Sequence, residues 1–253
     1  LSGHHTIIMA ALTAVMLSMF GLPTAAVIAI GAAVVGIMSV LTPAISMPFM
    51  RKVTGGETFA LGHWATTGYI FAGFMGKIFG KNPEETSTEK MELPKWMGFF
   101  KEPVILMGIG VFLIEIVCCI FAGSEFVAGY AGSTHMVVWA LMQGFIFSAG
   151  VSVILLGVRM ILAELVPAFK GIAEKIVPNA IPALDCPTVF TFAPNAIMVG
   201  FIGYTIGQFI AFGIFLATGM TVIIPTLLHS FFMGGTAAIF ANAAGGRRGA
   251  FIG

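Results

Sequence analysis

Asp185 is the residue of this sequence best placed to do chemistry. It is the single aspartate of the chain and stands between Leu184 and Cys186, in a segment, 176–195, that contains four prolines. An ionisable side chain among apolar residues is costly and indicates a functional site. The structural alternative is a carboxylate that caps the short helix after it by accepting backbone N–H groups. One side chain can fill both roles, and we expect Asp185 to contact a ligand.

Two histidines, His4 and His63, each follow a glycine. Glycine lets the backbone approach a ligand closely, and imidazole offers both a donor and an acceptor to a hydroxylated solute. A structural hydrogen bond is the alternative for either residue, but the repeated Gly-His pair favours ligand binding. His135 and His229 stand near the ends of apolar runs, where we expect them to lie at a membrane interface.

The remaining polar residues of the apolar runs predict no catalysis. Gln143 and Gln208 are expected to bond across helix interfaces, and Glu115 is a candidate proton-relay carboxylate or a contact to a neighbouring helix or subunit. Catalytic triads, phosphate-binding glycine loops and His-Glu-x-x-His spacing are absent. The three cysteines have neither disulfide nor metal-site spacing. The sequence therefore predicts no cofactor and no metal.

The composition decides the kind of scaffold that positions these residues. Of 253 residues, 58% are hydrophobic and 9% are charged, and the mean hydropathy is +1.02. A soluble chain carries about 25% charged residues. A net charge of +1 excludes nucleic-acid binding, which needs a basic face. We predict an all-α polytopic membrane protein, a helical bundle with broken or re-entrant elements.

Apolar runs with at most one charged residue predict six spans, at 6–21, 24–41, 103–123, 134–162, 196–217 and 221–242. Between them lie two broken elements. Residues 42–63 carry two prolines and a Gly-Gly pair before the apolar stretch 67–79, and residues 163–195 read as an amphipathic stretch followed by a proline-rich re-entrant segment. Broken backbone at membrane depth must be satisfied by protein or by a wet cavity. Two such elements in a glycine-rich bundle are typical of a transporter or permease with a mid-membrane site.

The charges also predict an orientation. Residues 77–102 hold ten of the 23 formal charges and must lie in water, with an aromatic interfacial helix at 96–100. The loop at 124–133 contains no Lys or Arg. By the positive-inside rule the 77–102 loop is cytoplasmic and the 124–133 loop faces outward.

Several motifs follow one another in order. They are Gly-Val-Arg-Met-Ile-Leu-Ala-Glu-Leu at 157–165, Ala-Leu-Asp-Cys at 183–186, Phe-Ala-Pro-Asn-Ala at 192–196, Phe-Ala-Asn at 240–242 and Gly-Gly-Arg-Arg-Gly-Ala at 245–250. Together with the two Gly-His pairs and a charged loop ending in Leu-Pro-x-Trp, they resemble the ascorbate-specific enzyme IIC permeases of the bacterial phosphotransferase system. The resemblance covers nearly the whole chain, which we expect to be a single permease region, 1–253, of a longer protein.

The resemblance implies a homodimeric permease of the bacterial inner membrane that translocates ascorbate or a similar hydroxylated solute. A cytoplasmic IIB partner, supplied by IIA, would phosphorylate the solute, so the permease itself would be non-catalytic. His4, His63 and Asp185 match substrate-site positions of that family.

The chain departs from the family at Ile8, Met9 and Trp64, where the family has glutamines. Sites built on such amide bonds discriminate strongly between solutes. Two other functions fit the residues. One is an ion- or proton-coupled secondary transporter with Asp185 or Glu115 as the coupling carboxylate. The other is a non-transporting receptor or assembly subunit.

Overall fold

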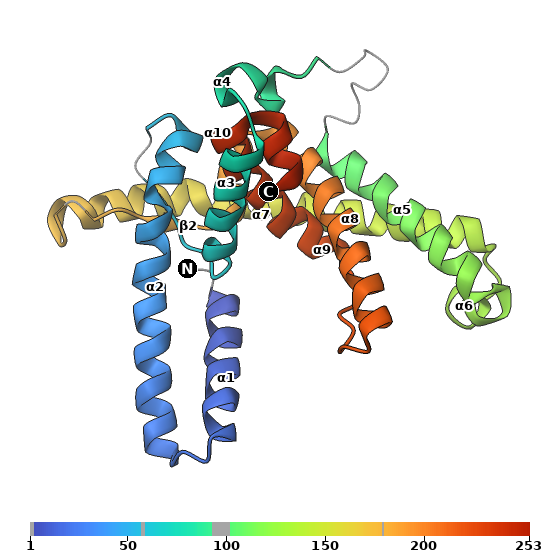
Figure 1. The fold of residues 1–253 in the computed structure, drawn as a ribbon, viewed down its shortest axis with the longest axis horizontal. Coiled ribbons are helices and arrows are strands. Elements are labelled where there is room, and N and C mark those ends of the chain that lie inside the picture. The colour runs from blue at the N-terminus through green and yellow to red at the C-terminus, as the bar shows by residue number, and fades with distance from the viewer. Residues whose placement is uncertain (1–2, 57–58, 93–101, 179) are drawn as a thin grey trace.

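The described part of the chain is mostly helical, as predicted. The computed structural model describes residues 3–56, 59–92, 102–178 and 180–253. Its α-helices are α1 (Gly3–Met19), α2 (Thr24–Thr54), α3 (Thr66–Phe79), α4 (Pro83–Thr86), α5 (Pro103–Ala122), α6 (Ser124–Ala131), α7 (Met136–Lys175), α8 (Pro194–Thr218), α9 (Leu227–His229) and α10 (Gly235–Ile252) (Figure 1). Two short 3-10 helices, η1 (Thr88–Lys90) and η3 (Cys186–Thr191), a π-helical turn, η4 (Ser230–Gly234), and the strands β1 (Ala60–Leu61) and β2 (Ala183–Leu184) complete the described elements.

Five described helical segments are long and apolar enough to cross a membrane: α2, Val104–Ala122, Met136–Phe169, α8 and the run Leu227–Ile252. These confirm five of the six predicted spans. The predicted span at 6–21 corresponds to a shorter apolar helix, His5–Met19.

The last helical run is the centre of the bundle. In the most apolar 18-residue stretch of this run, 56% of the residues are buried inside the molecule. In the corresponding stretches of the other four spans the share is 6–17%. Small residues allow this position, because a side chain at Gly245 would overlap the carbonyl oxygen of Gly76 in α3, and one at Gly76 would lie 2.6 Å from the carbonyl oxygen of Ala241. Close approach of glycines is how membrane helices gain packing contacts.

The first predicted break begins later than expected. The prediction that helicity fails from residue 42 is wrong, because α2 continues through Pro43 and Pro48 to Thr54. Membrane helices tolerate proline where neighbouring groups satisfy the freed backbone, and Thr42, Pro43 and Ser46 are buried inside the molecule. The helix ends at Gly55, whose φ of 69° gives a left-handed cap.

Three other boundaries also differ from the prediction. Helix α7 is continuous from Met136 to Lys175, so the amphipathic stretch at 163–175 extends the span instead of following it; it runs across the direction of α2 in Figure 1. The loop at 124–133 contains α6. The last run begins at Leu227 after an extended segment and reaches Ile252, because Gly246, with φ of 65°, lets it kink and continue. The interfacial helix predicted at 96–100 lies outside the described residues.

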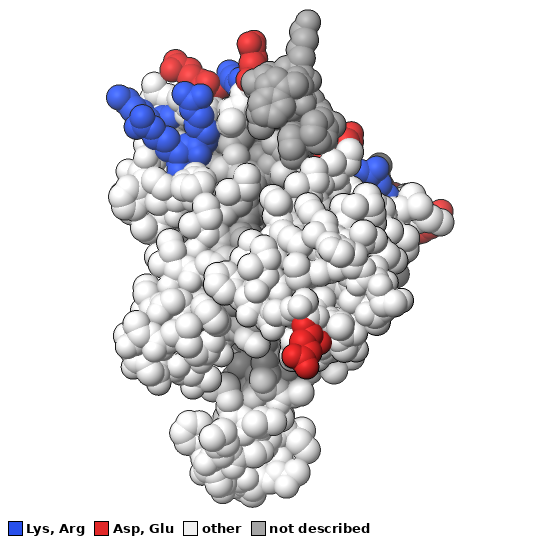
Figure 2. Space-filling model, turned by 90° about the vertical axis from the view of Figure 1, so that its right-hand side faces the viewer, with Lys and Arg blue, Asp and Glu red and all other residues white. Residues whose placement is uncertain are grey.

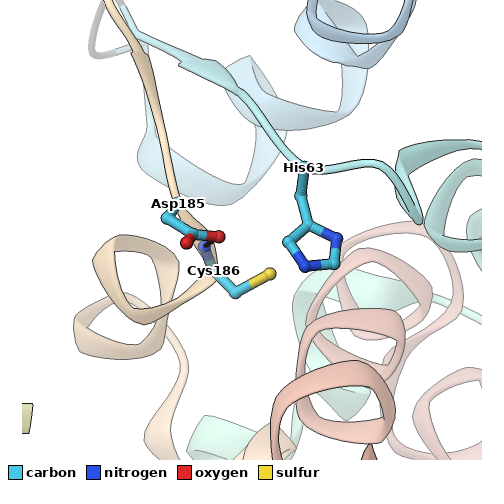
Figure 3. A group of neighbouring side chains, drawn as sticks. All are labelled: His63, Asp185 and Cys186. Atoms are coloured by element: carbon cyan, nitrogen blue, oxygen red, sulfur yellow. Dashed lines mark hydrogen bonds between the residues drawn. The ribbon is translucent and has the colours of Figure 1, made fainter. Parts of the chain in front are cut away.

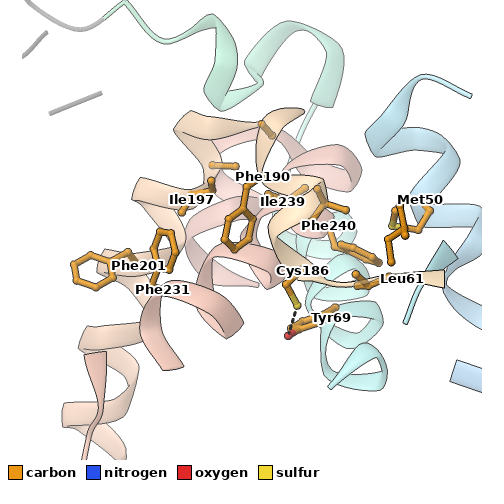
Figure 4. Packing of buried hydrophobic residues seen from close by; sticks show 14 of the residues in the cluster. Met50, Leu61, Tyr69, Cys186, Phe190, Ile197, Phe201, Phe231, Ile239 and Phe240 are labelled. Carbon is orange, nitrogen blue, oxygen red and sulfur yellow. Dashed lines mark hydrogen bonds between the residues drawn. The ribbon is translucent and has the colours of Figure 1, made fainter. Parts of the chain in front are cut away.

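The two broken elements meet through β1 and β2. The strands pair in parallel, with Ala60 opposite Ala183 and Leu61 opposite Leu184. The Gly62 N–H donates to the Leu184 carbonyl at 2.7 Å. Parallel strands bring their carboxyl ends to the same edge, so the residues after β1 and β2 become neighbours. Leu61 belongs to a buried cluster with Met50, Tyr69, Phe190, Phe231 and Phe240 that surrounds this edge (Figure 4).

Charged residues gather at one end of the molecule (Figure 2). The ends of α2 and α10 contribute four exposed cations, Arg51, Lys52, Arg247 and Arg248, and the segment 81–92 adds charges of both signs. Below this end, the face in Figure 2 is almost uncharged. A charged end over a wide apolar surface is the distribution expected for a membrane protein with one highly charged aqueous face.

Candidate functional site

A cavity of about 300 Å³ lies where the two broken elements meet. Both elements line it, together with α1, α7 and the run from α9 into η4. Its lining residues are His5, His63, Ile154, Asp185, Cys186, Pro187, Leu228, His229, Phe232 and Met233. Apolar walls with a few convergent polar groups are typical of small-molecule sites.

His63 presents a hydrogen-bond donor at this cavity. Its side chain is 3% exposed, and its Nδ1 accepts the Ala65 N–H at 3.1 Å. Because Nδ1 is an acceptor, the hydrogen-bond network assigns the ring proton of the neutral imidazole to Nε2. In Figure 3 the ring extends toward Cys186. The hydrogen-bond donor of the His63 ring is therefore its Nε2–H.

Tyr69 joins three elements behind the cavity. Its hydroxyl lies 3.1 Å from His63 Nδ1 and 3.4 Å from Cys186 Sγ, and it donates to Met233 Sδ at 3.3 Å. The side chain is 2% exposed, and its hydroxyl links the first broken element, the second and η4. Sequence reasoning missed this residue. The available signal was a tyrosine inside an apolar run, because a buried hydroxyl requires a partner.

Asp185 fills the structural role that the sequence offered as an alternative, and it also lies at the cavity. It is the N-cap of η3, where its carboxylate accepts the Cys186 N–H at 2.8 Å, and it also lines the cavity. Cys186, which lies outside the five candidate spans, is buried. Burial, and secondly the Asp185 carboxylate, raise the pKa of its thiol to about 12. At neutral pH the thiol is therefore protonated. In this form it is a weak hydrogen-bond donor and acceptor, and it is not the nucleophilic thiolate.

His63, Asp185 and Cys186 each have a donor atom within 4.8 Å of the others (Figure 3). That spacing alone is compatible with a transition metal. The Ala65 N–H donates to His63 Nδ1 at 3.1 Å, so the proton of the neutral ring lies on Nε2. In this tautomer neither ring nitrogen offers its lone pair to a metal, and metal binding would have to break the bond to Ala65.

Helix α1 brings His5 to the cavity. The rings of His5 and His63 are 4.7 Å apart at their centroids and meet edge to face at 75°. The side chain of His4, the predicted residue, lies outside the described part of the chain. Trp64 donates from Nε1 to Thr6 Oγ1 at 3.3 Å. This bond ties α1 to the first broken element. The adjacent histidine pair was the signal for His5.

His229 also lines the cavity, where sequence analysis expected an interfacial residue. Its Nδ1 hydrogen-bonds the hydroxyl of Thr226. The predicted cross-helix bond of Gln208 is confirmed: its Oε1 accepts the Thr226 N–H at 2.7 Å and its Nε2 donates to Ser230 Oγ at 3.0 Å. Gln208 thus fixes the end of the extended segment against α8. Glu115, the other candidate carboxylate, is half-buried in α5 and is not among the lining residues.

Comparison with known proteins identifies the family. The family described as "PTS system sugar-specific permease component" (EIIC-GAT) matches residues 1–253. The chain belongs to this permease family. This confirms the resemblance carried by the motifs. A similar curated protein is the "Ascorbate-specific PTS system EIIC component" of Mycoplasma pneumoniae, 29% identical over 230 residues, which cover 80% of this chain and 34% of that protein. The chain therefore spans about a third of the relative's length.

Proposed function

We propose that this permease-family chain binds ascorbate, or a closely similar hydroxylated solute, in the 300 Å³ cavity and translocates it for phosphorylation by a cytoplasmic IIB partner that IIA supplies. The observation that carries the proposal is the meeting of His63 and Asp185 at the edge of the β1–β2 pair. The name of the Mycoplasma relative supports ascorbate as the solute.

The lining residues have complementary roles in this proposal. The Nε2–H of His63 donates to a solute oxygen, and the Asp185 carboxylate accepts from a solute hydroxyl. His5 and His229 add ring nitrogens, while Phe232 and Met233 supply apolar wall. A volume of about 300 Å³ is at the small end for ligand cavities and suits a solute of sugar size. His4 stays a proposed contact on the strength of its Gly-His pair.

Energetic coupling tests this function. In vesicles containing the complete protein, uptake should require phosphorylated IIB and deliver phosphorylated ascorbate, because phosphorylation removes free solute from the inside. Collapsing the proton gradient should leave uptake largely intact. If an uncoupler stops uptake directly and IIB is dispensable, the proton-coupled alternative is correct, with Asp185 or Glu115 as the coupling carboxylate.

Orientation and assembly complete the proposal. We expect the charged segment 77–102 to face the cytoplasm of the bacterial cytoplasmic membrane, because Lys and Arg concentrate there. A cysteine at Lys90, an exposed position, in a Cys118→Ala background should resist an impermeant thiol reagent added to intact cells, whereas one at exposed Ser133 should react. The opposite pattern reverses the orientation. The implied homodimer is measured by the mass of the detergent-solubilised protein.

A further inference from the structure

Helix α8 begins without a cap of its own. Its N-cap position is Ala193, which offers no side-chain acceptor to the first turn. Glu89, more than a hundred residues earlier, supplies it: one carboxylate oxygen accepts the Asn195 N–H at 3.3 Å and the other the Ala196 N–H at 3.1 Å. A carboxylate satisfies the unpaired N–H groups and favours the positive end of the helix dipole.

The segment that carries Glu89 is fixed on two sides. The Oδ1 of Asn242, in α10, accepts the Thr88 N–H at 2.9 Å, and its Nδ2 donates to Ser87 Oγ at 3.1 Å. The Nδ2 of Asn195, in α8, donates to the Thr88 carbonyl at 3.1 Å. Thr88 is fully buried. Residues 87–89 therefore form a clamp between the start of α8 and α10. The two asparagines belong to the Phe-Ala-Pro-Asn and Phe-Ala-Asn motifs.

The start of α8 is connected directly to the candidate site. Only Phe192 and Ala193 separate it from η3, whose first residue is Cys186 and whose N-cap is Asp185. The middle of η3 packs into the buried hydrophobic cluster, because its Val189 side chain is 0% exposed. A second cavity, of about 500 Å³, lies at the other end of η3 and is lined by Phe192 and Ala193 together with clamp residues. The start of α8 and the site residues Asp185 and Cys186 thus lie at the two ends of one short 3-10 helix.

We propose that Glu89 is a positioning residue for the substrate site: by capping α8 from the charged loop, it holds η3 and so fixes Asp185 and Cys186 at the 300 Å³ cavity. The proposal rests on the proposed function of that cavity. In this proposal the 87–89 clamp is part of the machinery that holds the substrate site, and not only a connection between two spans.

Glu89→Gln tests this role, with Glu84→Gln as the matched control. Glu84 is exposed, lines the same 500 Å³ cavity and forms none of the bonds described for Glu89. Each variant therefore removes one negative charge from the lining of the same cavity, and only Glu89→Gln alters the cap of α8. Glutamine keeps one oxygen acceptor, but it places an NH2 group where the second carboxylate oxygen accepts a backbone N–H and removes the negative charge from the start of α8. For the complete protein in detergent, Glu89→Gln should raise the Kd for ascorbate about fivefold, the scale of a helix-cap and helix-dipole contribution, and Glu84→Gln by less than about twofold.

A second readout does not need the substrate. In a Cys118→Ala, Cys119→Ala background, the buried Cys186 thiol should react with N-ethylmaleimide several-fold faster in Glu89→Gln than in Glu84→Gln. Unchanged labelling in Glu89→Gln, or equal acceleration in both variants, overturns the proposal, as does an unchanged Kd in a protein that binds ascorbate. If the wild type does not bind ascorbate, the proposed function fails for that solute, while the labelling rates still decide the role of the clamp.

Discussion

Asp185→Asn should lower the affinity of the complete permease for ascorbate about tenfold or more, without preventing membrane insertion. Asparagine keeps a carbonyl oxygen that can accept the Cys186 N–H, now bound by the carboxylate at 2.8 Å, so η3 retains its cap. It loses the charged acceptor that faces the cavity. Hydrogen bonds to charged groups contribute about 1.5–3 kcal/mol against about 0.5–1.5 for neutral pairs. Equilibrium binding of radiolabelled ascorbate in detergent measures the difference.

The matched control for Asp185→Asn is Glu115→Gln. It removes the same charge from α5, where the side chain is half-buried and does not line the cavity. We expect its affinity to stay within about twofold of the wild type. If wild type and Asp185→Asn bind ascorbate equally well, Asp185 is not part of the binding site. If only Glu115→Gln loses affinity, the functional carboxylate is Glu115 in α5.

Gly245→Ala should destabilise the protein strongly. Its new methyl group would overlap the carbonyl oxygen of Gly76, which belongs to the backbone of α3 and cannot rotate away. Overpacking of this kind destabilises by about 1–3 kcal/mol, and we expect the upper part of that range because α10 is the buried centre of the bundle. Thermal unfolding of the detergent-solubilised protein should show a lower midpoint and less folded material.

Gly36→Ala provides the comparison. Gly36 lies inside α2, and a Cβ there would meet nothing within 4 Å. Alanine favours helix over glycine by about 1 kcal/mol, so this variant should be neutral or slightly more stable. If both variants unfold at the wild-type temperature, the close contact between α3 and α10 does not limit stability.

The sequence predicts the parts of the site better than their arrangement. Asp185 and His63 stand out because ionisable and Gly-flanked groups are rare in apolar runs. Their proximity depends on β1 and β2, and two-residue strands such as Ala60–Leu61 carry no periodicity from which pairing could be predicted.

Other differences arise from tertiary contacts that local sequence does not encode. Pro43 and Pro48 are helix breakers by intrinsic preference, yet α2 continues through both; membrane helices tolerate proline where their surroundings satisfy the freed backbone groups. Tyr69 looks like any aromatic residue of an apolar run until the fold brings Cys186 and Met233 to its hydroxyl. The Glu89 cap joins residues too far apart in the chain for a capping motif to predict.

The parallel pairing of β1 and β2 also sets an order of biogenesis. During synthesis β1 is made before α3, α5 and α7, whereas its partner β2 follows α7. Until then the Ala60 and Gly62 N–H groups, which later bond Pro182 and Leu184, need water or the insertion machinery as a temporary partner, because lipid offers none. Until β2 is made, the first half of the site lacks these backbone partners. A nascent chain that ends before β2 therefore cannot complete the 300 Å³ cavity, which residues on both sides of α7 line.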